Sequence, residues 1–296
     1  MKETLQRASV IVGSVVCSTF LSASAWAQTS SFTATYTGQG SGATTCGATM
    51  NITGQEPTTG THPVFLYMVG TTETYNNNGA ATAAVAGMAS RGYVAASIQY
   101  DSGSFGNCSQ IGGKAKCIFN AASSASAVSK LCSRASADCS KGIVVGGFSQ
   151  GSVIADLAKN FDSRVQAAWG MGDWTTYSFF NLSSCVANGN RTLASDHLRV
   201  INGQADTFGG SNLRNQLQTL TGFSCGSSAF NCLQNNGSGW YLVQNGQVSD
   251  GQADHCYMRN GGCFASQTNI DAGWQNGTDV WEVNANLNWL TGFTQH

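Results

Sequence analysis

The clearest pattern along the chain is a series of short, almost wholly apolar runs separated by longer polar stretches. Continuous runs of this kind are typical of strands that are buried on both faces, as in a parallel sheet. The sequence therefore predicts strands at 64–69, 93–98, 142–145, 165–169, 198–201 and 240–243.

Segments with helical character lie between these runs. Helices are expected at 80–90, 121–131, 153–159, 212–220 and 279–290, the last behind a cap at Thr278. Strands that alternate with helices predict an α/β fold, with a mostly parallel central sheet and helices on both faces. Two further strands, near 31–37 and 48–53, have no helix between them and are expected to form an antiparallel edge.

The first 27 residues have the pattern of a secretory signal peptide. Lys2 and Arg7 precede an apolar stretch at 10–21, and Ala25-Trp26-Ala27 supplies the small residues of a cleavage site. The apolar stretch is too short to span a bilayer as a helix. We therefore expect cleavage after Ala27, and a secreted protein, extracellular or periplasmic, made of one catalytic domain at 28–296.

Composition narrows the classes of partner. The net charge is −1 and only 10% of the residues are charged. A nucleic-acid-binding protein needs a basic face, so this class is excluded. No second apolar run could cross a membrane, and no linker or repeat divides the chain. We expect a monomer that acts on a small or polymeric substrate.

The eleven cysteines indicate disulfide bonds rather than a metal site. Cleavage of the signal peptide would remove Cys17 and leave an even number, as expected for an exported protein. No Cys-x-x-Cys or paired-histidine spacing is present, so we expect no metal, and nothing in the sequence calls for a cofactor. Closeness along the chain predicts the pairs Cys108–Cys117, Cys132–Cys139, Cys225–Cys232 and Cys256–Cys263, which leaves Cys46 for Cys185.

Two Gly-x-Ser-x-Gly pentapeptides are candidates for a nucleophile elbow. Ser149, in "GFSQG", follows a predicted buried strand and precedes a predicted helix, as an elbow requires. Ser224, in "GFSCG", follows a polar segment whose Gly222 has the character of a helix stop. Context therefore favours Ser149 as the nucleophile.

The candidate base is found by elimination among four histidines. His62 and His197 each precede a predicted strand, at the end of a parallel sheet away from the usual ligand site, and His296 is the last residue. His255 lies in a predicted loop between the last strand and the last helix. It is the histidine expected to accept a proton from Ser149.

A carboxylate is needed to orient the histidine. Asp206 follows the predicted strand at 198–201, just past Gly203, and is our first choice. Asp173, after the preceding strand, is the alternative. The order Ser149, Asp206, His255 is that of α/β-hydrolases.

These residues, with the segments "PVFLYMVG", "MASRGYVAASIQYD", "GIVVGGFSQGS", "LRVINGQADTF" and "DGQADHC", resemble a secreted α/β-hydrolase. The chain is similar to cutinases, polyester hydrolases and the dienelactone-hydrolase group over 63–255. The resemblance implies an α/β-hydrolase fold and a serine esterase that works through an acyl-enzyme. It also implies an oxyanion hole made by the backbone N–H of Gln150 and that of Thr71, with Thr72 as the alternative.

Substrate contacts are expected from aromatic residues near strand ends. Trp174 follows Asp173 and is similar in placement to tryptophans that wall the cleft of polyester hydrolases, and Tyr100 follows the strand at 93–98. The alternative for both is a packed structural role. A peptidase, thioesterase or acyltransferase on the same fold, or a non-catalytic binding protein, would be the competing functions.

Overall fold

The computed structural model describes residues 28–177 and 179–296, and the predicted signal peptide lies outside them. Nine strands form one mixed sheet in the order β1-β2-β4-β3-β5-β6-β9-β11-β10. The strands are β1 (Thr29–Gln39), β2 (Cys46–Pro57), β3 (Val64–Met68), β4 (Val94–Ile98), β5 (Ile143–Phe148), β6 (Val165–Met171), β9 (Leu198–Gly203), β10 (Asn231–Leu233) and β11 (Gly239–Val243). A separate hairpin pairs β7 (Thr176–Tyr177) with β8 (Phe180–Asn181).

The centre of the sheet is parallel and its edges are antiparallel. Strands β4, β3, β5, β6, β9 and β11 run parallel to one another. The pairs β1–β2, β2–β4 and β10–β11 are antiparallel. Every residue of β3, β4 and β5 is buried, as continuous apolar runs predict for central strands. The α/β class and the antiparallel edge at the first two strands are as expected, while β10 was not predicted.

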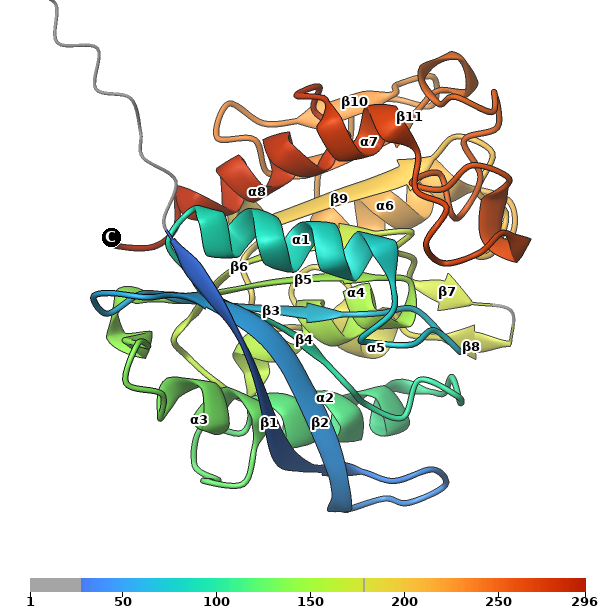
Figure 1. Ribbon diagram of the computed structural model, residues 1–296. Coiled ribbons are helices and arrows are strands. Elements are labelled where there is room, and N and C mark those ends of the chain that lie inside the picture. Colours follow the sequence, from blue (N-terminus) through green and yellow to red (C-terminus); the bar gives the residue numbers. More distant parts are fainter. Residues whose placement is uncertain (1–27, 178) are drawn as a thin grey trace, which may run out of the picture.

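Helices cover both faces of the sheet (Figure 1). They are α1 (Gly79–Ser90), α2 (Cys108–Phe119), α3 (Ala127–Cys132), α4 (Gln150–Asp156), α5 (Ser183–Val186), α6 (Leu213–Thr221), α7 (Ala272–Asn276) and α8 (Val283–Thr291). Helices α1 and α8 contact each other on one face, and α2 contacts α3 and α4 on the other. No helix among the described residues is long and apolar enough to cross a membrane.

The structure corrects several helix boundaries. Helix α2 was not predicted, because Gly112 and Gly113 in its middle lower helix propensity. A capping box between Asn107 and Gln110 satisfies free backbone N–H groups at the start of α2 and so offsets the low helix propensity of the two glycines. Helix α3 covers only the end of the range expected at 121–131, and α8 begins behind Glu282 rather than Thr278.

Five disulfide bonds join cysteines within the ranges that the structure describes, three of them as predicted and two not. Cys132–Cys139, Cys225–Cys232 and Cys256–Cys263 each close a short loop. The predicted pairs Cys108–Cys117 and Cys46–Cys185 are wrong, because the bonds are Cys46–Cys117 and Cys108–Cys185. Cys108 and Cys117 stand at opposite ends of α2, where a rise of 1.5 Å per residue separates their Cα atoms by about 13 Å. A disulfide requires less than about 7 Å.

Candidate active site

Ser149 stands on a sharp turn between β5 and α4. Its φ of 54° makes it one of three non-glycine residues with positive φ in the described chain. Such a conformation costs free energy and persists only where the surrounding structure holds it. Here the Ser149 N–H donates to the carbonyl of Met171 at 2.8 Å, and α4 begins at the next residue. The strand, turn and helix expected around Ser149 are all present.

Glycine is required on both sides of Ser149 because backbone segments approach each other closely there. A Cβ on Gly147 would lie 2.2 Å from the carbonyl oxygen of Gly151. A Cβ on Gly151 would lie 2.2 Å from the carbonyl oxygen of Met68 on the neighbouring strand. Neither position accepts a side chain without moving the backbone. The tight packing of α4 against the sheet therefore fixes the place of Ser149.

His255 lies in the long loop between β11 and α7 and faces Ser149. Its Nε2 is 2.9 Å from Ser149 Oγ, and the side chain is almost wholly buried. Two aromatic rings contact the imidazole. Phe208 stacks on it with the ring centroids 4.2 Å apart, and the Phe148 ring centroid lies 5.0 Å away. These contacts restrict the orientation of the ring.

Asp206 holds the other nitrogen of the imidazole. Its Oδ2 is 2.8 Å from His255 Nδ1 and accepts a second hydrogen bond from Trp174 Nε1 at 2.8 Å. Its Oδ1 accepts from the backbone N–H of Phe208 at 3.0 Å. Because a carboxylate only accepts, Nδ1 carries the proton and Nε2 is left to accept from the Ser149 hydroxyl. The three residues thus form one hydrogen-bonded chain.

Asp173, the alternative acid, does not take this place. It is fully buried, and its carboxylate makes no hydrogen bond to His255, whose Nδ1 is bonded to Asp206. Burial raises its pKa well above the ordinary value, and the negative charge of Asp156 raises it further. A carboxyl group that favours its neutral form is poorly suited to stabilise an imidazolium ion.

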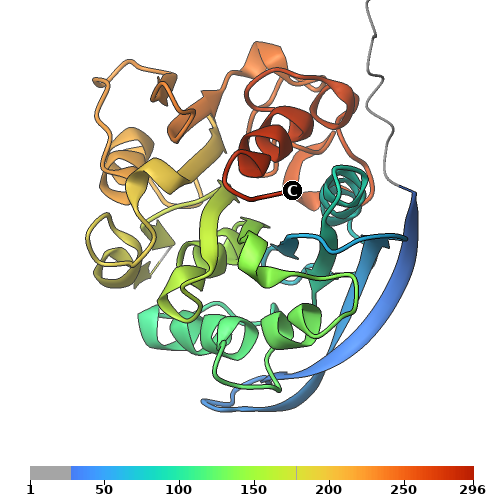
Figure 2. The same ribbon diagram turned by 90° about the vertical axis from the view of Figure 1, so that its left-hand side faces the viewer.

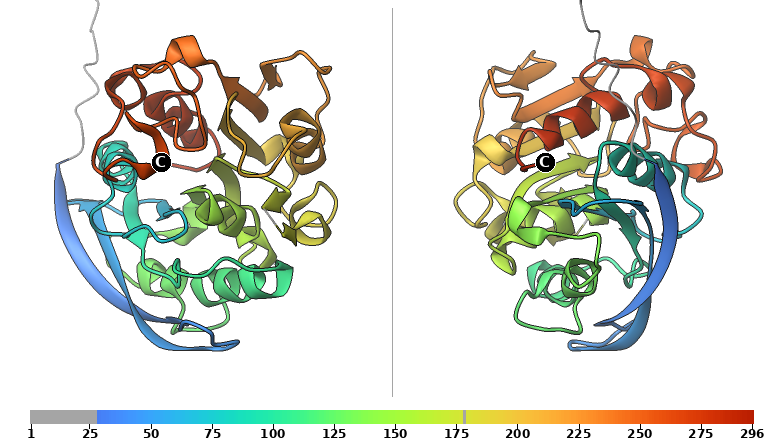
Figure 3. Two further views of the ribbon diagram at one scale, coloured as in Figure 1. Left: turned by 90° about the vertical axis from the view of Figure 1, so that its right-hand side faces the viewer. Right: turned by 60° about the vertical axis from the view of Figure 1, so that its left-hand side comes forward.

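The other three histidines lie at the opposite end of the sheet. His62 and His197 lie just before β3 and β9. The His62 ring contacts the carbonyl of Thr59 in the same loop, and the His197 ring contacts the carbonyl of Gln166 on β6. His296 is at the C-terminus, on the side of the molecule that faces the viewer in Figure 2. Strands β3 and β9 point the other way, toward the side seen in the left view of Figure 3. The elimination that selected His255 is consistent with these positions.

The loop between β3 and α1 supplies a candidate oxyanion donor beside Gln150. Gln150 is the first residue of α4, so its N–H has no acceptor within the helix. Its side-chain Nε2 donates to Thr71 Oγ1 at 3.2 Å and brings that loop close to Ser149. The N–H of Thr72 already donates to the carbonyl of Ser102 at 2.8 Å, whereas no hydrogen bond from the Thr71 N–H occurs in the described part of the chain. Thr71 is therefore favoured over Thr72.

Ser149 and His255 open into a cavity of about 450 Å³, and six phenylalanine and tyrosine side chains are among the residues that line it. The other lining residues are Thr71, Thr72, Glu73, Phe105, Phe148, Tyr177, Phe180, Phe208, Cys256, Arg259, Cys263, Phe264, Ala265 and Gln267. Three exposed phenylalanines lie in this region: Phe208 and Phe264 line the cavity, and Phe179 adjoins Phe180. In the described ranges no cluster of His, Cys, Asp and Glu could hold a metal ion.

Trp174 and Tyr100, expected to bind substrate, do not line this cavity. Trp174 is fully buried behind Asp206 and donates to it. Tyr100 is buried and donates to the carbonyl of Val69 at 2.5 Å. Both are packed structural residues, so the expectation that they wall the cleft is corrected. Phe148 and Phe208, which do line it, were missed although each lies within two residues of a candidate triad member.

Comparisons with known proteins do not assign a chemistry to this site. No protein-family model matches the chain, and no curated protein matches it. The assignment of function therefore depends on the geometry of the described residues.

Proposed function

We propose that this protein is a secreted serine hydrolase of the α/β-hydrolase fold that cleaves carboxylic esters. The observation that carries the proposal is the hydrogen-bonded chain from Ser149 Oγ through His255 to Asp206, with distances of 2.9 and 2.8 Å. A serine on a strained turn between a strand and a helix, with the triad order Ser, Asp, His, is the signature of a nucleophile elbow. The five disulfide bonds support export to an oxidising compartment.

The first half of the reaction forms an acyl-enzyme. Ser149 Oγ attacks the ester carbonyl carbon while His255 Nε2 accepts the hydroxyl proton. Asp206 keeps the imidazole in the reactive tautomer and stabilises its positive charge. The N–H groups of Gln150 and Thr71 are the donors proposed for the oxyanion, and each such donor contributes about 3 kcal/mol to the stability of the transition state.

The second half of the reaction releases the acid. His255 returns its proton to the alkoxide oxygen, so the C–O bond breaks and the alcohol leaves. Water then donates a proton to His255 Nε2 and attacks the acyl carbon. Collapse of the second tetrahedral intermediate breaks the bond to Ser149 Oγ, and the proton on His255 restores the serine hydroxyl.

The cavity favours an apolar ester. Six phenylalanine and tyrosine side chains line it, and the ion pair between Glu73 and Arg259 within it is neutral overall. The exposed side chains of Phe179, Phe208 and Phe264 extend this apolar character to the surface of the molecule. Exposed apolar side chains near a pocket are typical of a surface that meets an apolar partner. Polymeric esters are therefore included in the proposed substrate class.

A substrate panel tests the proposal. Initial rates are measured on p-nitrophenyl esters of short and long acids, on matched anilides and thioesters, and on a polyester film. We expect hydrolysis of the esters, with labelling of Ser149 by an organophosphate. A preference for anilides or thioesters would indicate a peptidase or thioesterase instead. The absence of both turnover and labelling would indicate a binding protein.

A further inference from the structure

A buried ion pair is built into the wall of the candidate active site. Arg259 Nη2 contacts Glu73 Oε1, with only 2% and 7% of the two side chains exposed. Glu73 Oε2 accepts from the backbone N–H of Gly70 at 2.9 Å and from Asn78 Nδ2 at 2.9 Å. Burying two charges carries a desolvation penalty that the pair only partly recovers, so stability alone is a weak reason for its presence.

The pair joins the two loops that carry the chemistry. Glu73 lies in the loop at 69–78, two residues after Thr71, and its hydrogen bond to Gly70 closes the turn that presents the Thr71 N–H. Arg259 lies in the loop at 244–271. Its backbone N–H donates to the carbonyl of Cys256, which directly follows His255. The ion pair therefore connects the loop of the proposed oxyanion donor to the loop of the base.

The pair also sets the charge near the imidazole. The Arg259 guanidinium carbon lies 5.6 Å from the centroid of the Phe148 ring, and the same ring lies 5.0 Å from the His255 ring. A full positive charge next to this ring would disfavour the imidazolium ion that forms during the reaction. Glu73 neutralises that charge.

We propose that Glu73 and Arg259 form a positioning pair for the reaction of Ser149, which fixes the oxyanion loop relative to His255 and keeps the charge beside His255 balanced. The proposal rests on the proposed serine hydrolase function. Among the described residues, no hydrogen bond or ion pair joins Glu73 or Arg259 to Ser149, His255 or Asp206. Each therefore acts through the position of Thr71 or through the charge near His255.

The remaining titratable groups around the pair and the imidazole are few. Asp206 is bonded to His255, and Asp254 precedes it with a pKa raised by burial. Tyr67 and Tyr100 face Glu73, and burial raises the pKa of each well above its ordinary value, so both are neutral. Tyr177 lines the cavity and Tyr257 follows His255 by two positions, and burial raises the pKa of these two in the same way. The variants described below leave all six groups in place.

Single variants are expected to move the pH profile in opposite directions. Glu73→Gln leaves the Arg259 charge unbalanced and should move the acidic limb of kcat/KM to lower pH. Arg259→Met leaves the Glu73 charge and should move the limb to higher pH. A unit charge about 10 Å away at an effective dielectric constant near 20 predicts shifts of about one pH unit.

Geometry is separated from charge by two more variants. The double variant Glu73→Gln/Arg259→Met is neutral, so its acidic limb should return to the wild-type pH. Its kcat should stay about 10- to 100-fold low with KM little changed, because the connection between the loops is lost. Arg259→Lys keeps the positive charge and is the variant expected to fold most readily. Its acidic limb of kcat/KM should stay at the wild-type pH, and its loss of kcat should be smaller than that of the double variant.

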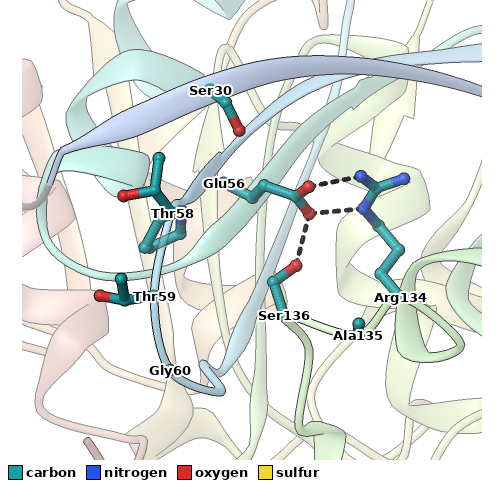
Figure 4. Close-up of a pocket in the computed structure, with 9 residues that line it drawn as sticks. Ser30, Glu56, Thr58, Thr59, Gly60, Arg134, Ala135 and Ser136 are labelled. Carbon is teal, nitrogen blue, oxygen red and sulfur yellow. Dashed lines mark hydrogen bonds and ion pairs between the residues drawn. The ribbon is translucent and has the colours of Figure 1, made fainter.

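A second ion pair elsewhere in the molecule provides the matched control. Arg134 forms two hydrogen bonds to Glu56, at 2.6 and 2.5 Å, in a pocket that Ser149 does not line (Figure 4). Glu56→Gln should lower the melting temperature and leave kcat and the acidic limb unchanged.

The imidazole titration of His255, followed by NMR, gives a readout that does not require turnover. A wild-type protein that hydrolyses no ester would count against the proposed function, and the NMR shifts would still test the charge balance set by the pair. Opposite shifts in the single variants and recovery in the double variant support the proposal. Folded Glu73 and Arg259 variants that lose only melting temperature, as Glu56→Gln does, would overturn it.

Discussion

The two Gly-x-Ser-x-Gly segments of this chain have the same letters and different structures. Gly147 and Gly151 are glycines because a Cβ would meet backbone atoms at 2.2 Å, and the serine between them carries the positive φ. Gly222 and Gly226 have φ values of 80° and 92°, and a Cβ on Gly226 would meet nothing within 4 Å. The second segment uses glycine to turn the chain, whereas the first uses it to bring three backbone segments together.

The secondary structure and the burial around the two serines also differ. Ser149 is 6% exposed and lies between β5 and α4, and every residue of α4 is buried. Ser224 is exposed and follows the C-terminus of α6, an amphipathic helix with a polar outer face. A pentapeptide motif is therefore informative only together with the strand before it and the helix after it.

The largest expected effect separates the two serines. Ser149→Ala should lower kcat on an ester by about a million-fold, as loss of the nucleophile does in other triads. Ser224→Ala should keep the wild-type rate within about twofold, because surface substitutions rarely disturb a distant site. Initial rates on one p-nitrophenyl ester measure both. Full activity of Ser149→Ala, or organophosphate labelling at Ser224, would reverse the assignment.

The second prediction compares the two carboxylates near Ser149, the proposed nucleophile. Asp206→Asn should lower kcat by about 10⁴-fold, because an amide favours the wrong tautomer of His255. Asp173→Asn should cost less than about tenfold, since Asp173 makes no hydrogen bond to the imidazole. Steady-state kinetics on the two purified variants decide between them. Equal losses would mean that the buried carboxylate takes part in the triad.

Much of this site could be predicted because it is encoded locally. The order strand, glycine, serine, glycine, helix lies within one short segment, and the choice of His255 needed only a coarse map of strand ends. Contacts between distant segments could not be found in this way. Arg259 and Glu73 are 186 residues apart, and no local pattern marks either as a partner of the other.

The sequence-based predictions that were wrong also concern contacts between distant segments. The disulfides of Cys108 and Cys117 were assigned from closeness in sequence, but a helix separates its two ends in space. Trp174 was expected to wall the cleft because it follows a strand, yet its indole points to Asp206. Side-chain direction after a strand end depends on tertiary packing, which the pattern of apolar residues does not specify.

The third prediction compares two disulfide bonds of equal sequence separation, one next to His255 and one next to Ser224. Cys256–Cys263 follows His255, and Cys225–Cys232 follows Ser224, and each spans seven positions. Removing either bond by double alanine substitution should cost about 2–4 kcal/mol of stability. Only the Cys256→Ala/Cys263→Ala variant should also lose about 100-fold in kcat at a temperature where it is folded, because small displacements of a catalytic group are costly. Equal kcat in the two folded variants would show that the bond near His255 is purely structural.

The smallest expected effect concerns the helix that follows Ser149. Burial raises the pKa of Asp156 to about 7, and the nearby Arg191 charge lowers it only in part. The native state therefore keeps this proton up to about pH 7, whereas the unfolded chain releases it near pH 4. The native state binds more protons between these values, so the stabilising contribution present below pH 4 is lost as pH rises to about 7.

Asp156→Asn should remove this loss and leave the variant more stable than the wild type at pH 8, on the order of 2 kcal/mol, with a smaller difference at pH 5. Urea unfolding at the two pH values measures the change. Asp279→Asn, at an exposed position, is the control and should show no such gain. Helix α6, before Ser224, contains no carboxylate, and the residues it buries are three leucines and Thr221. A wild-type protein equally stable at pH 5 and pH 8 would show that Asp156 is not held neutral, and that the helix after Ser149 tolerates charge as an exposed helix does.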